Sequence, residues 1–185
     1  MMKALPPSQL RQLDWWRLWV WVSMGEYRTP QQSRSSMGLA TALELADAAR
    51  ARSREMGFRP IAVVRVDDGG HTVASVREDG ASLIRIHSAA NKAWSCVSYG
   101  LATSEMGKRL ATWHGQDWTQ HVIGASGVVP GHHLINTPGG VVIRDTAGTV
   151  IGTIGVANAE DDEDVCLNAI AKVGLFAHIG AGEHG

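Results

Sequence analysis

The stretch VVIRDTAGTVIGTIGVA at residues 141–157 decides the fold class, because two runs rich in β-branched residues flank an Asp-x-x-Gly turn. The stretch IAVVRVDDGGHTVASV at 61–76 is built on the same plan, with DDGG at its turn. Each stretch predicts a β-hairpin. Two hairpins in one short chain predict a shared antiparallel sheet.

Helical patterns lie before and between these hairpins. The segment GLATALELADAARARSREMG at 38–57 has one apolar face, and its residues at helical spacing are Leu39, Leu43, Ala46 and Ala49 or Arg50. The segment LIRIHSAANKAWSCVSYGLA at 83–102 is apolar all round, which predicts a helix buried on several sides. A short helix is expected over TSEMGKRLATW at 103–113.

The remaining segments complete an α+β pattern. Residues 114–138 have no clear period and predict a loop with at most one short strand. The segment at 159–180 predicts a closing helix, whose acidic first turn suits the positive end of the helix dipole and whose end is marked by Gly180 and Gly182. The order predicts an antiparallel sheet with helices packed on its faces.

Composition limits the classes of function. The chain has 185 residues, 44% of them hydrophobic and 19% charged, which favours one soluble globular domain. A formal net charge of −1 argues against nucleic acid as a partner, since phosphate binding needs a basic face. No apolar run is long enough for a transmembrane helix. Cys96 and Cys166 lack metal-ligand spacing, so we expect buried free thiols and a cytoplasmic location.

Residues 1–36 differ from the rest of the chain. Four of the seven tryptophans lie within LDWWRLWVW, and a polar stretch follows them. Asp14 and Arg17 interrupt any signal-peptide core. We therefore expect a Trp-rich N-terminal extension at 1–36, either a translated leader or an amphipathic arm, and one domain over 37–185.

Several segments taken in order resemble a known family. They are REDGA at 77–81, AANKAW at 89–94, LATSEM at 101–106, TPGGVVI at 137–143 and VIGTIGV at 150–156, followed by Asp164. With them the chain is similar to the GlcG/HbpS-like haem-binding proteins, a group that includes the C-terminal part of some corrinoid adenosyltransferases. The resemblance implies a profilin-like fold with about five antiparallel strands, haem as ligand, and assembly into dimers or larger rings.

The chain departs from the family pattern at three places. It reads Ala157-Asn158-Ala159 where the family usually has Ser-Gly-Gly, and Glu78 replaces an apolar residue. The first helix contains no histidine, so the resemblance supplies no fixed iron ligand.

Arg77, Asp79 and Lys92 are the first candidate site residues. Arg77 and Asp79 lie where a strand ends, and an arginine there can clamp a carboxylate in two-pronged fashion. The alternative is an ion pair of Arg77 with Asp79 or Asp164. Lys92 lies in an apolar helix, where desolvation suits a base or an anion anchor. Alternatively, its stem covers apolar surface while its charge reaches water.

The other candidates are small or acidic residues. Gly139 and Gly140 allow a ligand close to the backbone, or else serve a turn. Thr103 caps a helix or contacts a ligand. Asp164 belongs to the acidic run 160–164, which is a solvated helix start or a site, and it matches the family position.

Histidines are the candidate ligands of haem iron. None of the eight histidines has chelating spacing, but haem iron needs only one neutral imidazole in apolar surroundings. His87, in the helix expected to be buried, and His114, beside Trp113, are the candidates. Surface or core roles without metal are the alternatives.

Two functions of different classes are consistent with these residues. The first is binding of haem or a related tetrapyrrole, which the protein would buffer or degrade, with Arg77 and Lys92 neutralising propionates. The second is an enzyme acting on a small organic acid, with Arg77 as anchor, Lys92 as acid or base, and Asp79 or Asp164 as orienting group. A purely interacting module is the third alternative.

Overall fold

The computed structural model describes residues 37–112, 115, 117, 119–120, 124 and 130–180. The Trp-rich segment 1–36 and His114 lie outside the described residues, so the expected domain boundary stays a prediction. Among the described helices, none combines the length and the hydropathy needed to cross a membrane.

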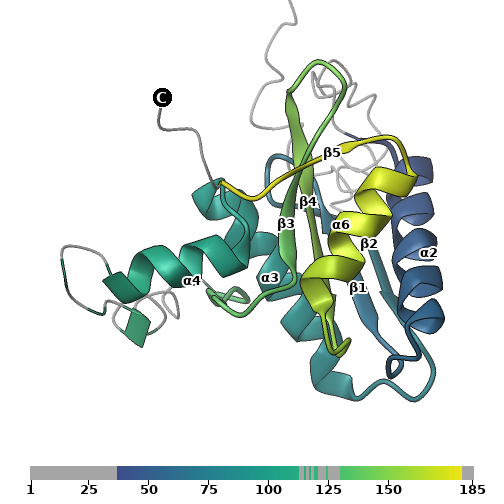
Figure 1. Cartoon of the computed structure of the whole chain (residues 1–185), viewed down its shortest axis with the longest axis horizontal. Coiled ribbons are helices and arrows are strands. Elements are labelled where there is room, and N and C mark those ends of the chain that lie inside the picture. The colour runs from purple at the N-terminus through teal and green to yellow at the C-terminus, as the bar shows by residue number, and fades with distance from the viewer. Residues whose placement is uncertain are drawn as a thin grey trace, which may run out of the picture. The chain divides into compact units, whose positions relative to one another are not determined.

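Five antiparallel strands form one sheet in the order β2-β1-β4-β3-β5 (Figure 1). Their bounds are β1 Ala62–Val66, β2 Thr72–Arg77, β3 Gly140–Arg144, β4 Val150–Ala157 and β5 Phe176–His178. The two predicted hairpins are β1–β2 and β3–β4, and they join through pairing of β1 with β4 at the centre of the sheet. The predicted α+β, profilin-like sheet is therefore confirmed.

The turn of each hairpin contains an aspartate whose side chain accepts hydrogen bonds from backbone N–H groups of the same turn. Asp67 Oδ1 accepts hydrogen bonds of 2.9 and 2.8 Å from two backbone N–H groups of its turn. Asp145 Oδ1 accepts two hydrogen bonds of 2.9 Å in the same way. Aspartate favours such turns because its short side chain reaches backbone N–H groups two residues on. The repeated sequence pattern thus has a local physical cause.

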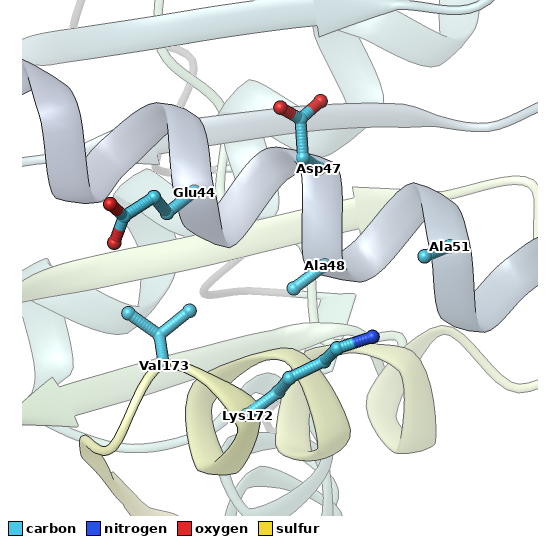
Figure 2. A pocket seen from close by; sticks show the side chains of 6 residues that line it. All are labelled: Glu44, Asp47, Ala48, Ala51, Lys172 and Val173. Atoms are coloured by element: carbon cyan, nitrogen blue, oxygen red, sulfur yellow. The ribbon is translucent and has the colours of Figure 1, made fainter.

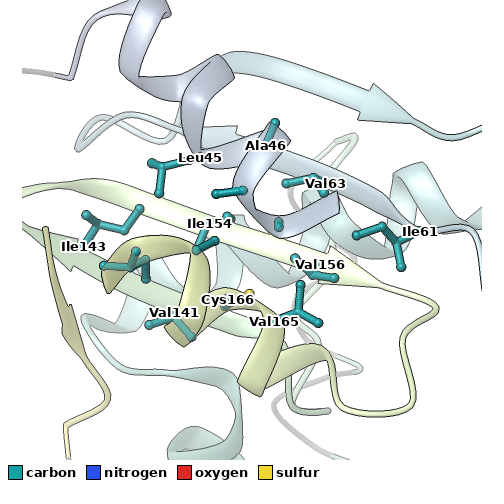
Figure 3. Close-up of a cluster of buried hydrophobic side chains, with 14 of the residues drawn as sticks. Leu45, Ala46, Ile61, Val63, Val141, Ile143, Ile154, Val156, Val165 and Cys166 are labelled. Carbon is teal, nitrogen blue, oxygen red and sulfur yellow. The ribbon is translucent and has the colours of Figure 1, made fainter. Parts of the chain in front are cut away.

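Helices cover both faces of the sheet. On one face lie α2 (Leu39–Glu55) and α6 (Asp162–Lys172), and on the other lies α3 (Leu83–Tyr99), which is followed by α4 (Thr103–Thr112) (Figure 1). Figure 3 shows the larger core, between the sheet and the α2–α6 pair. The smaller cluster, beneath α3, is built largely from alanine and valine.

The buried face of α2 agrees with the prediction only in part. Ala46 and Ala49 are buried as predicted, but Leu39 and Leu43 are 58% and 44% exposed. The buried residues of the helix are Ala42, Leu45, Ala46, Ala48, Ala49 and Ser53. The prediction was wrong for the two leucines, because leucine and alanine supply alternative apolar stripes on this helix.

Two other helix predictions also need correction. The α3 helix is not buried on several sides, because Leu83 and Ile84 are 79% and 60% exposed. The closing helix ends at Lys172 rather than near Gly180, since Gly174 has a φ of 77° and turns the chain into strand β5. The acidic helix start is confirmed, and the Asp161 side chain caps it by accepting from Asp164 N at 2.9 Å.

Candidate functional site

Lys92 lies inside the protein and is paired. Its side chain is 7% exposed, and Nζ lies 2.7 Å from Asp162 Oδ2. The same Nζ donates a 3.1 Å hydrogen bond to the carbonyl of Val156 on β4. The ammonium group therefore ties α3 to β4 and to the start of α6.

The backbone at Gly139 and Gly140 fits tightly beside this ion pair. Gly139 has a φ of 113°, and a Cβ there would lie 2.9 Å from Lys92 Nζ. A Cβ on Gly140 would lie 2.7 Å from both Cys96 Sγ and the Lys92 carbonyl oxygen. Because these distances leave no room for a side chain, close packing against α3 explains the glycine pair.

Thr103 and the cysteines complete the same cluster. The Thr103 hydroxyl accepts a 3.0 Å hydrogen bond from Gly140 N and so fixes the start of β3. Cys166 Sγ donates to the Gly139 carbonyl at 3.4 Å. Burial raises the pKa of both the Cys96 and the Cys166 thiols, so both stay protonated at neutral pH. The predicted buried free thiols are confirmed.

Four expected site residues, Lys92, Thr103, Gly139 and Gly140, thus do meet in space. Asp162 completes their cluster, and burial raises its pKa while the charge of Lys92 opposes that rise. The contacts of this cluster join α3, α4, α6, β3 and β4. Its ammonium group is already bonded to a carboxylate and a carbonyl, so the geometry supports a structural role.

Asp164 lies apart from this cluster. Its carboxylate pairs with Arg52 of α2, with Oδ2 at 2.9 Å from Nε and 2.8 Å from Nη2. The alternative Arg77–Asp164 ion pair is therefore wrong. Within the acidic run it is Asp162 that faces Lys92, and sequence reasoning did not separate these carboxylates, because a helix start rotates each successive side chain by about 100°.

Arg77 is the last residue of β2, and Asp79 lies in the turn that follows it; both are exposed. Arg77 Nη1 donates to the carbonyl of Ala81, just before α3 begins. In the described part of the chain Arg77 forms no ion pair, so the alternative Arg77–Asp79 pair is also wrong. The Arg77 guanidinium therefore has no acidic partner among the described residues, although its Nη1 group is hydrogen-bonded to Ala81.

Glu78, between those two residues, makes the contacts that hold this turn. Its side chain is 9% exposed and lies 3.2 Å from Arg50 Nε and 2.7 Å from Arg54 Nη2. Its other oxygen accepts from Ile61 N at 3.0 Å. Glu78 departs from the family pattern, and its two arginine partners on α2 explain that departure.

His87 is exposed, not buried as the sequence indicated. It lies four residues after Leu83 and three after Ile84, so the three side chains share one face of α3. Leu83 and Ile84 are also exposed. We call Leu83, Ile84 and His87 the α3 face. An imidazole flanked by two large apolar side chains is thus presented at the surface.

The other described histidines have different surroundings. His132 stacks on Trp94 with ring centroids 4.7 Å apart. His71 and His133 are exposed, and His178 on β5 is half-buried. Among the described residues, no group of three His, Cys, Asp or Glu side chains is arranged to hold a metal ion.

Arg65 is a buried residue that sequence reasoning missed. It lies on β1 with 1% exposure and donates to the carbonyls of Val66, Thr153 and Ile151, the last two at 3.0 and 3.2 Å. Burial lowers its pKa to about 10, against the opposite pull of Asp67. The signal available was a lone arginine inside the apolar run IAVVRV.

Comparison of the chain with known protein families gives one match. The family model for haem degrading protein HbpS-like matches residues 37–172 of the chain. The chain belongs to the HbpS-like family. No curated protein matches the chain. The match leaves out residues 1–36 and the last residues of the chain.

Solved structures of similar proteins support this membership. The chain is 25% identical to PduOC in a crystal structure of a PduOC–haem complex, which covers 77% of this chain and 99% of that chain with a TM-score of 0.65. It is 30% identical to HbpS, over 75% of this chain and 91% of that one, with a TM-score of 0.61. The chain is 25% identical to Klebsiella pneumoniae protein ORFY, over 76% of this chain and 93% of that one, with a TM-score of 0.63.

The departure from the HbpS-like pattern after β4 also has a structural explanation. Among the described residues other than glycine, Asn158 alone has a positive φ, of 94°. Its side-chain Nδ2 donates a 2.6 Å hydrogen bond to the Pro60 carbonyl. Asparagine tolerates this conformation better than most residues. Asn158 therefore preserves a turn whose positive φ glycine adopts most easily.

Proposed function

We propose that this HbpS-like protein binds haem on the α3 face, with His87 as the iron ligand. The observation that carries the proposal is the exposed imidazole between Leu83 and Ile84. One common kind of haem site combines a single neutral imidazole with apolar surface for the macrocycle. The α3 face offers both on a single helix, whose backbone holds the three side chains in register.

Family membership supports haem as the ligand. The family description names haem degradation, and a similar protein was solved as a haem complex. A tetrapyrrole also suits the chemistry of this face, because the ring needs apolar contact and its propionates need a cation. Binding of haem is common to its storage and its degradation.

Arg77 is the proposed partner of a haem propionate. Its hydrogen bond to the Ala81 carbonyl holds the guanidinium near the start of α3, which begins at Leu83. Charge-assisted hydrogen bonds from arginine to a carboxylate are among the stronger polar contacts in proteins. Lys92 is not assigned this role, because Asp162 and the Val156 carbonyl occupy its ammonium group.

A haem titration of the full chain tests this proposal. The visible spectrum is recorded while haem is added to wild type, His87→Ala, Arg77→Ala and the matched control His133→Ala, which also removes an exposed histidine. We expect a saturable Soret band for wild type and control. Haem binding should weaken at least roughly tenfold in His87→Ala. A flat wild-type titration, or equal binding by His87→Ala, would overturn the proposal.

A time course of the Soret absorbance distinguishes storage of haem from its degradation. Bound haem is kept with a reductant and air, and the Soret absorbance is followed. A stable band indicates storage, and a progressive loss faster than that of free haem indicates degradation. Assembly into rings and a cytoplasmic location both stay predictions.

A further inference from the structure

A groove lies between α2 and α6, on the face of the sheet opposite α3 (Figure 2). Its lining residues are Glu44, Asp47, Ala48, Ala51, Lys172 and Val173. These six residues include no histidine, and their two carboxylates outnumber the one ammonium group, which disfavours a ligand with two propionates. The α3 face, with an imidazole and large apolar side chains, suits haem better than this groove does.

The α3 face ends where a second segment covers the helix. Asn91 lies one helical turn after His87, and its Oδ1 accepts a 3.2 Å hydrogen bond from His133 N. We call residues 132–135 the strap. The strap is held on the second half of α3, whereas the large side chains of the α3 face, on the first half, are exposed.

The rings of Trp94 and His132 are stacked at this boundary. Their centroids are 4.7 Å apart and their planes differ by 13°. Ser95 Oγ accepts a 2.8 Å hydrogen bond from Ile135 N and so fixes the strap beside the stacked rings. On another side of the indole lies Gly70, where a Cβ would be 3.7 Å from Trp94 Cδ1. The aromatic pair is therefore held by the strap and by the β1–β2 turn.

His87 lies between this aromatic pair and a cation. Trp94 follows His87 by seven residues, which is nearly two full turns, so both lie on the same side of α3, about 10 Å apart along its axis. In the other direction from His87 the helix leads back to its start, where Arg77 Nη1 donates to the Ala81 carbonyl. One end of the site thus offers a guanidinium and the other offers aromatic rings.

A haem molecule has the same polarity from one edge to the other. Its two propionates project from one edge of the macrocycle, and the opposite edge carries only methyl and vinyl groups. Given the haem site proposed above, we infer that bound haem points its propionate edge towards Arg77 and its vinyl edge against Trp94 and His132. Contact with the rings removes the vinyl groups from water, whereas a reversed haem would desolvate its propionates there.

Two haem analogues test this orientation with the full chain. Deuterohaem lacks both vinyl groups, and the dimethyl ester of haem lacks both propionate charges. The dissociation constants of haem and of each analogue are measured by Soret titration in the same dilute non-ionic detergent. We expect wild type to bind haem about fivefold or more tightly than deuterohaem, and also more tightly than the ester.

Variants at the two ends of the site should affect different analogues. Trp94→Ala and His132→Ala should lose the preference for haem over deuterohaem and keep the preference for haem over the ester. Arg77→Ala should do the reverse. Trp94→Phe retains an aromatic ring and should keep most of the vinyl preference. Tyr99→Ala removes a 44% exposed aromatic side chain from another side of α3, and this control should keep both preferences.

The outcomes distinguish this orientation from the haem site itself. Circular dichroism first verifies that each variant is folded. A wild-type protein that does not bind haem would overturn both the site and the orientation. The orientation alone is wrong if wild type binds haem through His87 without preferring it to deuterohaem. It is also wrong if both Trp94→Ala and His132→Ala keep the full vinyl preference.

Discussion

Lys92 on α3 and Asp162 at the start of α6 form a 2.7 Å ion pair that links helices on opposite faces of the sheet. The two side chains are only 7% and 14% exposed. A pair with so little access to water is costly to break, because the remaining partner is a buried charge without compensation.

Asp162→Asn should lower the free energy of unfolding by about 3 kcal/mol. The substitution keeps the shape of the side chain and leaves the Lys92 ammonium group without its counterion. Urea unfolding of the full chain at neutral pH measures the loss. Asp79→Asn, at an exposed position, is the control and should change stability by less than about 0.5 kcal/mol. Equal losses in the two variants would contradict a special role for the pair.

Lys92→Met should be destabilised most strongly at high pH. Burial raises the pKa of Asp162 above its ordinary value of 3.8, and loss of the lysine charge removes a cause that lowers it. The folded variant therefore holds the Asp162 proton more tightly than the unfolded chain does. Its deficit relative to wild type should shrink as the pH falls. Urea unfolding of both proteins at about pH 4 and about pH 8 checks this, and a deficit independent of pH would contradict it.

The pKa of Glu78 is shifted in the opposite direction to that of Asp162. Burial raises its pKa, but hydrogen bonds from Ile61 N, Arg50 and Arg54, with the charge of Arg54, outweigh burial and hold the pKa below 4.5. Its stabilising contribution is present above that ordinary value and is lost as the pH falls through the folded pKa.

Glu78→Gln should therefore lose about 1–3 kcal/mol at neutral pH, and its difference from wild type should vanish in acid. Thermal unfolding against pH measures both effects. Glu55→Gln, on an exposed residue, should follow the wild-type curve throughout.

Gly140→Ala should destabilise the protein by about 1–3 kcal/mol. The new Cβ would lie 2.7 Å from Cys96 Sγ and from a backbone carbonyl, so α3 or β3 has to move. Gly38→Ala is the comparison, because a Cβ there meets nothing within 4 Å. The melting temperature of Gly140→Ala should be lower by about 2–4 °C for each kcal/mol lost. Equal melting temperatures would show that β3 adjusts without cost.

Asn158→Ala should cost more than Asn158→Gly. Alanine keeps the strain of a φ near 94° and also removes the hydrogen bond to Pro60, whereas glycine removes only the bond. We expect a loss of about 1–2 kcal/mol for alanine and less than about 1 kcal/mol for glycine. Differential scanning calorimetry of the three proteins gives the order. A glycine variant less stable than alanine would contradict the strain argument.

Local patterns were sufficient to predict the two hairpins and most helix positions, but not β5 (Phe176–His178), whose residues were assigned to the closing helix. Alternating β-branched runs and the Asp-x-x-Gly turns specify hairpins because each turn is satisfied by its own aspartate, within a few residues. The acidic start of α6 is likewise local, since Asp161 caps the helix that it begins. Gly174 shows the limit of this reasoning, because the sequence placed the end of the helix at Gly180 while the chain turns at Gly174.

Only the tertiary structure shows which residues far apart in the sequence contact each other. Which carboxylate of the acidic run meets Lys92, and which arginines meet Glu78, depends on how α2, α3 and α6 rotate on the sheet. The exposure of His87 and the phase of α2 depend on the same rotation. Sequence by itself determines where elements form, because those forces act between neighbours along the chain. Tertiary structure determines which side chains meet, because burial is shared among segments far apart in sequence.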